Sequence, residues 1–384
     1  MLDSELSRAL RVPRPDPYVY KSPLKRAAAG LLDMAGDFWL APQASPVDWG
    51  AVKRVAVLRL DHLGDLLNCF PLLKELRRRL PSAQIDLFVG PWGAELAQLC
   101  KDVDSVQVVD APWFRRPERV QWPWAEIRAL GKKIKAGNYD LGIELRGDLR
   151  HHLALWLSGT PSRLGQAVTA GRFLLSHPVA YDASLHEIDQ NLAVIGARPG
   201  ASVSLSVPAS ARSEAKKVMA ALKLKKNFVA VQAACGTAAK RWIPGRWAEL
   251  IKSLPASTQV VLLGAANEKE EMLSIAHQCG LRQPKVAAGM LSLTGLAAFV
   301  QEAKLVISVD SGPAHLAAAV GTPVLGLYSG TNLVSQWGLR GKNAHILRAE
   351  VPCSPCELTA CPYANECMRR ISTKEAAAAA RELL

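Results

Sequence analysis

One carboxylate stands where it could act on a bound substrate: Asp65, a few residues after an apolar run of strand length at residues 54–59. An aspartate at the carboxyl edge of a sheet can serve as a general base. The same position suits an aspartate that caps the following helix, and Gly64 gives the backbone freedom to turn there. The G-x-G-x-x-G pattern of dinucleotide-binding loops is absent here, so the segment alone leaves base and cap open.

A second group of residues, in the other half of the chain, has the chemistry to bind a diphosphate. Thr237 and Lys240 follow the apolar run at residues 228–233. A lysine can neutralise a phosphate and a hydroxyl can hydrogen-bond to it. Glu268 comes shortly after the next run, which ends at Leu263, and is placed like the acid that holds a ribose hydroxyl.

The segment V-D-S-G-P-A-H at residues 309–315 joins a third apolar run to a helix. Because Pro313 suits a first helical turn, the free amides of Ser311 and Gly312 can bind a phosphate. Asp310 can hold a hydroxyl or orient the loop. His315, one turn later, either faces the site or is a hydrogen-bonded residue of the core.

Four of the eight cysteines are bunched as Cys353-x2-Cys356-x4-Cys361-x5-Cys367. In a reducing compartment such a group more often binds a metal than forms disulfides. The pattern favours a structural site for zinc or iron, with disulfides and free thiols as alternatives. The four isolated cysteines are expected to be buried apolar residues.

Strands and helices must position these residues, and the hydrophobic pattern predicts parallel βαβ units. Strands are predicted at 54–59, 83–89, 106–109, 141–145, 228–233, 259–263, 305–309 and 323–328, and helices at 24–40, within 63–80 and at 124–136. Such alternation is typical of doubly wound parallel sheets. Their ligands bind beyond the carboxyl ends of the strands.

The turn-rich stretch 186–212 separates two halves of this kind. We expect four parts: an N-terminal extension with a basic amphipathic helix, two Rossmann-like domains, and a C-terminal cysteine cluster with a helix. Their predicted bounds are 1–50, 51–200, 201–348 and 349–384. The cleft between the two domains is the expected ligand site.

The formal net charge of +13 suggests an anionic partner: nucleic acid, an anionic membrane surface or a phosphorylated substrate. Scattered basic residues, 6% aromatic content and the lack of a nucleic-acid-binding motif argue against nucleic acid. Solvated helix faces account for part of the charge. With no signal peptide and no membrane-spanning run in view, we expect a cytoplasmic protein.

The helix predicted at residues 24–40 has a basic start and an apolar continuation. Such a helix can lie on a membrane surface. It can equally pack on the protein's own surface, and the sequence leaves both open.

Taken in order, the motifs resemble glycosyltransferase family nine, the lipopolysaccharide heptosyltransferase family, over residues 52–375. The matching segments are VAVLRLDHLGD (55–65), FPLL (70–73), DLGIELRGDLR (140–150), KRWIP (240–244) and VDSGPAH (309–315). Each is weak alone, and their order and spacing together make the match specific. The first fifty residues have no counterpart in the family core.

The resemblance implies a GT-B architecture, in which two Rossmann-like doubly wound domains face an interdomain cleft. It also implies an inverting displacement that needs no metal, with Asp65 as the base. Lys240 and the amides near Ser311 and Gly312 then hold the leaving diphosphate. Glu268 and Asp310 match acids that bind the nucleoside or the sugar, and we count Thr237 and His315 with this donor site.

On the acceptor side, the resemblance points to Arg59, His62, Arg146 and Arg150, which suit a phosphorylated or carboxylated lipid sugar. The function we expect is heptose transfer from ADP-heptose to a lipopolysaccharide core acceptor at the inner face of the cytoplasmic membrane. Two alternatives stay open: a relative with another nucleotide sugar or a protein acceptor, and a non-catalytic nucleotide-sugar-binding protein. The presence of both Asp65 and Lys240 favours an enzyme, and the hydroxyl-poor loop 236–239 leaves the donor sugar less certain than the reaction type.

Overall fold

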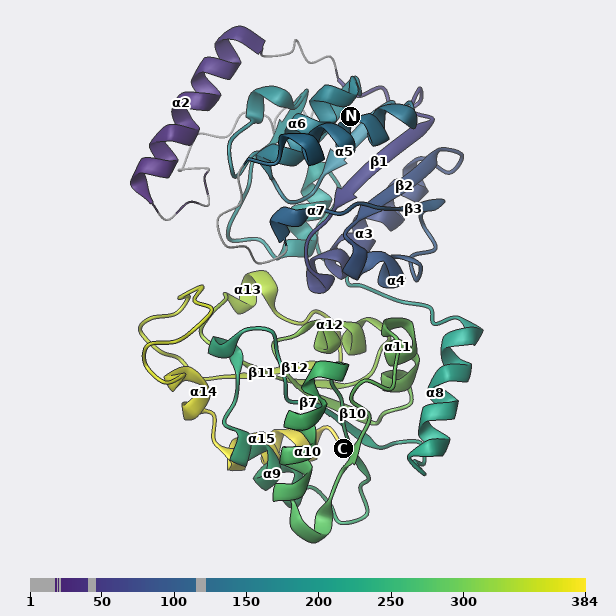
Figure 1. Ribbon diagram of the computed structural model, residues 1–384, viewed down its shortest axis with the longest axis vertical. Helices are drawn as coiled ribbons and strands as arrows, with labels where there is room; N and C mark the ends of the chain where they lie inside the picture. The colour runs from purple at the N-terminus through teal and green to yellow at the C-terminus, as the bar shows by residue number, and fades with distance from the viewer. Residues whose placement is uncertain (1–17, 19, 21, 41–45, 115–121) are drawn as a thin grey trace. The chain divides into compact units, whose positions relative to one another are not determined.

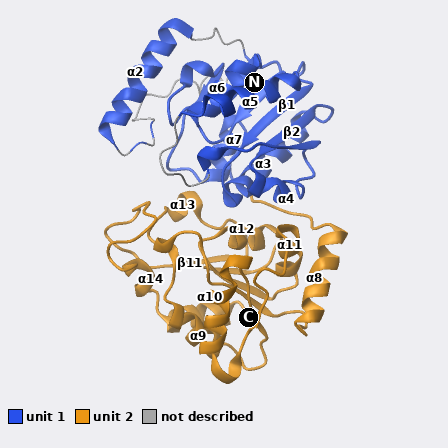
Figure 2. Ribbon diagram, in the orientation of Figure 1, with its two compact units in different colours: residues 1–201 blue, residues 202–384 orange. Residues whose placement is uncertain are grey.

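The computed structural model describes residues 18, 20, 22–40, 46–114 and 122–384 (Figure 1). The chain forms two compact units, residues 1–201 and 202–384 (Figure 2). Each unit has its own six-stranded parallel sheet, so the predicted α/β class with two doubly wound sheets is confirmed. Within the expected N-terminal extension, residues 1–17, 19, 21 and 41–45 lie outside the described residues.

The sheet of unit 1 has the strand order β3-β2-β1-β4-β5-β6. Its strands are β1 (Arg54–Arg59), β2 (Gln84–Val89), β3 (Ser105–Val108), β4 (Leu141–Glu144), β5 (Ser162–Gln166) and β6 (His177–Val179). Val57 of β1 pairs with Leu87 on one side and Ile143 on the other. The chain order reverses between β1 and β4, and this switch point is where ligands of such sheets bind.

Helices cover the sheet of unit 1 because its strands are apolar on both faces. They are α2 (Pro23–Leu40), α3 (Leu63–Arg79), α4 (Ala94–Ala97), α5 (Trp124–Ala136), α6 (Leu149–Ser158) and α7 (Glu187–Val194). Ile127 of α5 and Leu155 of α6 pack in one core with Ala56 and Leu58 of β1. Among the other helices of unit 1, α3 packs against α7.

Unit 2 repeats this topology, with the order β12-β11-β10-β7-β8-β9 and a switch point between β7 and β10. Its strands are β7 (Val229–Gln232), β8 (Val260–Leu262), β9 (Lys285–Val286), β10 (Leu305–Val309), β11 (Val324–Tyr328) and β12 (Ala344–Arg348). Its helices are α8 (Ala209–Ala221), α9 (Pro244–Ser253), α10 (Lys269–Gln278), α11 (Leu293–Gln301), α12 (Gly312–Ala319), α13 (Val334–Trp337), α14 (Glu366–Arg370) and α15 (Thr373–Glu382).

The C-terminal segment is built into the core of unit 2. Cys367, Met368 and Ile371 belong to the same buried cluster as Trp242 and Trp247. The two tryptophan rings meet edge to face at 4.9 Å, and Trp242 Nε1 donates a hydrogen bond to the Ile371 carbonyl oxygen.

Two differences from the expected elements matter for the site. The stretch 186–212 contains a helix, α7, so its description as turn-rich is wrong over residues 187–194. Strands β5, β6, β9 and β12 have no counterpart among the predicted strands, because they are short or carry polar residues and lack an apolar run. In the part of the chain that the structure describes, no helix combines the length and apolar character needed to cross a bilayer.

The packing of unit 2 predicts a large effect at Trp247, which is 1% exposed. Trp247→Ala should lower the free energy of unfolding by about 3–5 kcal/mol, because truncating a buried tryptophan leaves a cavity. Leu281→Ala, at a fully exposed leucine of the same unit, should change it by less than about 0.5 kcal/mol. Urea denaturation measures both, and equal effects of the two substitutions would contradict this packing.

Candidate active site

The Arg59 side chain, at the end of β1, forms salt bridges with three carboxylates at the switch point of unit 1. It is 2% exposed, and its nitrogens lie 2.8 Å from Asp61, 2.9 Å from Glu187 and 3.3 Å from Asp65. It also donates a hydrogen bond to the Leu145 carbonyl oxygen, just beyond β4. A buried guanidinium is stable only when its charge and its donors are matched, so these four groups fix one another.

Asp65 is the third residue of α3, whose N-cap is His62, so it is not the helix cap. Burial raises the pKa of Asp65 and the charge of Asp61 raises it further, whereas Arg59 and Arg146 oppose the shift. Arg146 also pairs with Asp61 at 2.9 Å. A carboxylate with a raised pKa is a better proton acceptor than an ordinary surface aspartate, as a general base requires.

Buried Glu144 holds the loop that follows β4. Its carboxylate accepts hydrogen bonds from the amides of Arg146 and Gly147 at 3.1 and 2.5 Å. Burial alone would raise the pKa of Glu144, but hydrogen bonds from His151 and His152 hold it well below its usual value. Gly147 has a φ of +76°, and a Cβ there would lie 2.5 Å from a backbone oxygen, so only glycine fits this turn.

Arg146 of this loop and Arg150 of the first turn of α6 extend over two neighbouring aromatic rings. The Arg146 guanidinium lies 4.6 Å from the ring centre of Phe114, and that of Arg150 lies 5.1 Å from Trp113. Asp148, the N-cap of α6, binds Arg150 at 2.5 Å. Stacking and pairing leave two partly exposed cations in fixed positions beside the carboxylate cluster.

The predicted acceptor residues differ in exposure, and therefore in whether a ligand can reach them. Arg146 and Arg150 are partly exposed, and His62 is exposed next to Asp65. Arg59 is the exception, since its buried guanidinium is committed to carboxylates and positions Asp65. Contact between Arg59 and an acceptor, as expected from the sequence, does not fit this burial.

Asp61 and Glu187 also belong to this cluster, although neither was predicted from the sequence as a site residue. Burial raises the pKa of Glu187 to about 7, Arg59 opposes that shift, and Asp65 and Asp61 add to it. Asp61 lies inside the quoted motif and could have been noticed there. Glu187 could not, because it lies on α7, far along the chain in a stretch taken for turns.

In unit 2 the structure brings Lys240, Asp310 and His315 together where β7 and β10 end. Lys240 Nζ lies 2.6 Å from Asp310 Oδ2, and His315 Nε2 lies 4.0 Å from Asp310 Oδ1. Asn332 donates a hydrogen bond to the same carboxylate at 3.3 Å. Lys240 is 20% exposed and can therefore still reach an anionic ligand.

The remaining donor candidates surround this group on neighbouring loops. Ser311 is the N-cap of α12 and Gly312 its first residue, so their amides lie at the positive end of the helix. Thr237 is the N-cap of a short 3₁₀ helix that ends at Lys240, and its side chain makes no cap hydrogen bond. Glu268 has a local role, since its carboxylate accepts from the Ala265 amide at 2.8 Å.

The cysteine-rich segment 353–367 forms hydrogen bonds with the backbone of the loop that contains Lys240. The Ala239 amide donates to the Thr359 carbonyl oxygen at 3.1 Å. The Asn365 side chain donates to the carbonyl oxygens of Ala238 and Arg241 at 2.7 and 3.2 Å. Changes in this segment therefore act directly on the backbone that carries Lys240.

The four clustered thiols themselves are spread from core to surface. Cys367 is buried, Cys353 is exposed, and Cys356 and Cys361 are half-buried, with every described cysteine a free thiol. Within the described ranges, no three His, Cys, Asp or Glu side chains are grouped so that they could hold a metal ion. The predicted metal site is therefore not assembled by this geometry and stays a prediction.

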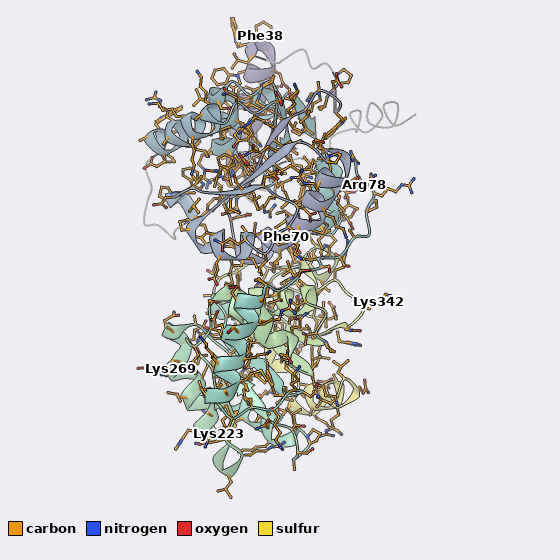
Figure 3. The ribbon with its side chains drawn as sticks, turned by 90° about the vertical axis from the view of Figure 1, so that its right-hand side faces the viewer. Phe38, Phe70, Arg78, Lys223, Lys269 and Lys342 are labelled. Carbon is orange, nitrogen blue, oxygen red and sulfur yellow. The ribbon has the colours of Figure 1, made fainter. Side chains whose placement is uncertain are left out.

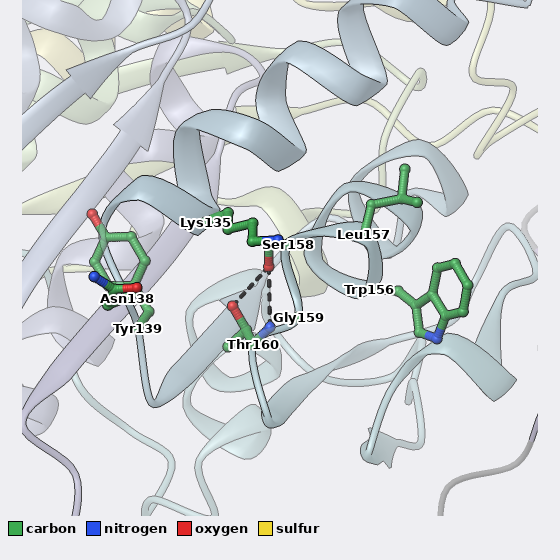
Figure 4. A pocket seen from close by; sticks show the side chains of 8 residues that line it. All are labelled: Lys135, Asn138, Tyr139, Trp156, Leu157, Ser158, Gly159 and Thr160. Atoms are coloured by element: carbon green, nitrogen blue, oxygen red, sulfur yellow. Dashed lines mark hydrogen bonds between the residues drawn. The ribbon is translucent and has the colours of Figure 1, made fainter.

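A pocket of about 580 Å³ in unit 1 lies elsewhere (Figure 4). Lys135, Asn138 and Tyr139 line it just before β4, and Trp156 to Thr160 line it just before β5. It therefore opens at the amino ends of these strands, opposite the edge that carries Asp65. The Ser158–Thr160 hydrogen bonds that close one wall are local, and we assign it no role in the site.

Several known proteins are similar to this chain in sequence or in structure. Lipopolysaccharide heptosyltransferase 1 of Pseudomonas aeruginosa is 26% identical over 327 residues, which cover 81% of this chain and 88% of that protein. The structure of E. coli ADP-heptose lipopolysaccharide heptosyltransferase II superposes with a TM-score of 0.71 at 20% identity, over 86% of this chain and 98% of that one. The iron-containing dodecameric glycosyltransferase TibC from enterotoxigenic E. coli reaches 0.53 at 16% identity, over 86% and 76%.

The family model described as glycosyltransferase family 9 (heptosyltransferase) matches residues 127–366, which is more than half of the chain. The matched range includes the Glu144 loop, the Lys240 loop and the segment 309–315. The two doubly wound sheets agree with the GT-B structures of the solved heptosyltransferases. This chain belongs to glycosyltransferase family 9, the heptosyltransferase family, and is a glycosyltransferase.

Proposed function

We propose that this enzyme transfers heptose from ADP-heptose to an anionic, lipid-linked sugar of the lipopolysaccharide core, at the inner face of the cytoplasmic membrane. The observation that carries the proposal is the Asp65 carboxylate, held at the switch point of unit 1 with a raised pKa. The donor is taken from the relatives, since one solved neighbour is named an ADP-heptose heptosyltransferase.

In the proposed reaction, Asp65 accepts the proton of the acceptor hydroxyl as its oxygen attacks the anomeric carbon of the donor. The bond from that carbon to the diphosphate oxygen breaks, and ADP leaves with the electron pair, which inverts the configuration. Lys240 offsets the charge of the leaving diphosphate, and the amides of Ser311 and Gly312 donate hydrogen bonds to it. Electrostatic stabilisation of this type is usually the largest contribution to catalysis. None of these steps needs a metal ion.

Arg146 and Arg150 fit an acceptor that carries phosphate or carboxylate groups. Their guanidinium planes are fixed by Phe114 and Trp113, so little rotamer freedom is lost when an anion binds. Arginine forks bind such groups in bidentate fashion. His62, exposed beside Asp65, can bind the same acceptor.

The first test measures donor binding and transfer with the same two proteins. ADP-heptose should raise the melting temperature of wild type and of Asp65→Asn alike, because the substitution leaves the donor residues in place. Transfer to a heptose-deficient lipopolysaccharide core should fall by at least about a hundredfold in Asp65→Asn, since the base is lost.

Glu126→Gln, at an exposed acid of α5, is the matched control and should retain full activity. Full transfer by Asp65→Asn would rule out the base. A melting shift with a UDP sugar and none with ADP-heptose would identify a relative that uses another donor.

A second prediction follows from the charges around Asp65. Arg59 lowers its pKa, so Arg59→Lys, which keeps the charge but loses the fork, should move the acid limb of the kcat/KM profile to higher pH. Asp61→Asn removes the negative charge that raises the pKa of Asp65, and should move that limb to lower pH. The expected shifts are about half to one pH unit, measured by ADP release between pH 4 and 9. Shifts in the same direction would contradict this arrangement.

The predicted structural zinc or iron also needs a direct test. Four thiolates are a chemically suitable donor set, and the structural neighbour TibC is an iron-containing protein, but here segment 353–361 would have to close on Cys367. Metal analysis of anaerobically purified protein should find about one ion per chain. Cys353→Ser should lose the ion and weaken ADP-heptose binding through the Lys240 loop, whereas Cys279→Ala should retain both. Four reactive thiols without an ion would show the prediction to be wrong.

A further inference from the structure

Helix α2 belongs to unit 1 (Figure 2), and its two acidic residues attach it to the rest of that unit. Buried Asp33 accepts hydrogen bonds from the amides of Gly171 and Arg172 at 2.7 and 3.1 Å and from the Tyr18 hydroxyl at 2.6 Å. Asp37 forms an ion pair with Arg172. Both acidic side chains of the helix are therefore directed toward the protein, Asp33 through hydrogen bonds and Asp37 through an ion pair.

The opposite face of α2 is apolar and exposed. Its large side chains are 42–80% exposed, namely Leu24, Leu31, Leu32, Met34, Phe38 and Trp39. Figure 3 shows Phe38 pointing outward from the helix, away from the rest of unit 1. The remaining charged residues of the helix, Lys25 and Arg26, lie exposed in its first turn. The outer surface of α2 therefore combines large apolar side chains with the exposed ammonium group of Lys25, whereas the Arg26 guanidinium donates a hydrogen bond to the Tyr20 carbonyl oxygen.

We infer that α2 is an interfacial helix that docks unit 1 on an anionic phospholipid bilayer. Helices that lie in a membrane surface have Leu, Phe and Trp on one face with Lys and Arg beside it. Trp and Tyr favour the headgroup level. The exposed cations of α2 and the formal net charge of +13 attract anionic lipids. A protein groove would accommodate the apolar side chains, but an anionic surface matches the cations as well.

The segment 169–172, which binds α2 and Tyr20, also holds the loop that carries Arg146 and the start of α6, which carries Arg150. Thr169 Oγ1 donates to the Gly147 carbonyl oxygen at 2.7 Å and accepts from the Leu149 amide at 2.9 Å. The Tyr20 hydroxyl donates to the Thr169 carbonyl oxygen at 3.1 Å. A bilayer bound through α2 is thereby placed in a fixed relation to the proposed acceptor residues. This link to a lipid-anchored acceptor rests on the proposed function, whereas membrane docking itself does not.

Co-sedimentation of the full chain with vesicles tests the docking. Wild type should pellet with phosphatidylcholine vesicles that contain phosphatidylglycerol, and should pellet less at high salt or without the anionic lipid. The double substitution Phe38→Ser and Trp39→Ser should lower the partition coefficient at least about tenfold. Leu281→Ser, at an exposed leucine of unit 2, should bind as wild type. Unchanged melting temperatures show that both variants are folded.

Three results would overturn docking: no vesicle binding by wild type, full binding by the double variant, or a wild-type dimer that the double variant abolishes. Transfer to a delipidated, water-soluble acceptor should be equal in wild type and the double variant, whereas transfer to acceptor in vesicles should fall. Vesicle binding by a chain that transfers no heptose would support docking and contradict the proposed function.

Discussion

The buried Arg59 guanidinium is the interaction on which unit 1 depends. It pairs with Asp61, Asp65 and Glu187, and its positive charge offsets part of the cost of burying these acids together. The cluster joins three parts of the chain: the end of β1, the first turn of α3 and the first turn of α7. Its charge balance also sets the proton affinity of Asp65, so the stability of the unit and the chemistry of the proposed base have the same origin.

The two units have the same strand topology, but the charged groups at their switch points differ in sign. In each, the strand order reverses between the first and fourth strands of the unit, and functional groups collect where these strands end. Unit 1 places buried acids there around one arginine, which suits removal of a proton. Unit 2 places Lys240 and a helix N-terminus there, which suits binding of an anion.

The sequence was sufficient for the elements whose signal is local. Apolar runs predicted β1, β2, β4, β7, β10 and β11 closely, because central parallel strands are buried on both faces. It was also sufficient to place Asp65 and Lys240 beyond such strands. Glu187 could not be predicted as part of the site from the sequence. Its partner Arg59 is 128 residues away in the chain, and the packing of α7 brings the two together. Burial of Arg59 was missed for the same reason.

The Lys240–Asp310 pair bears on how a donor would be held. An anion that binds Lys240 has to compete with a carboxylate already 2.6 Å away, so its net gain in the ground state is small. Negative charge that develops on a leaving diphosphate shifts this competition toward the ligand. Interactions that strengthen only in the transition state accelerate a reaction, whereas uniform binding does not. Under the proposed function, the pairing of Lys240 with Asp310 would therefore favour stabilisation of the leaving group over tight binding of the intact donor.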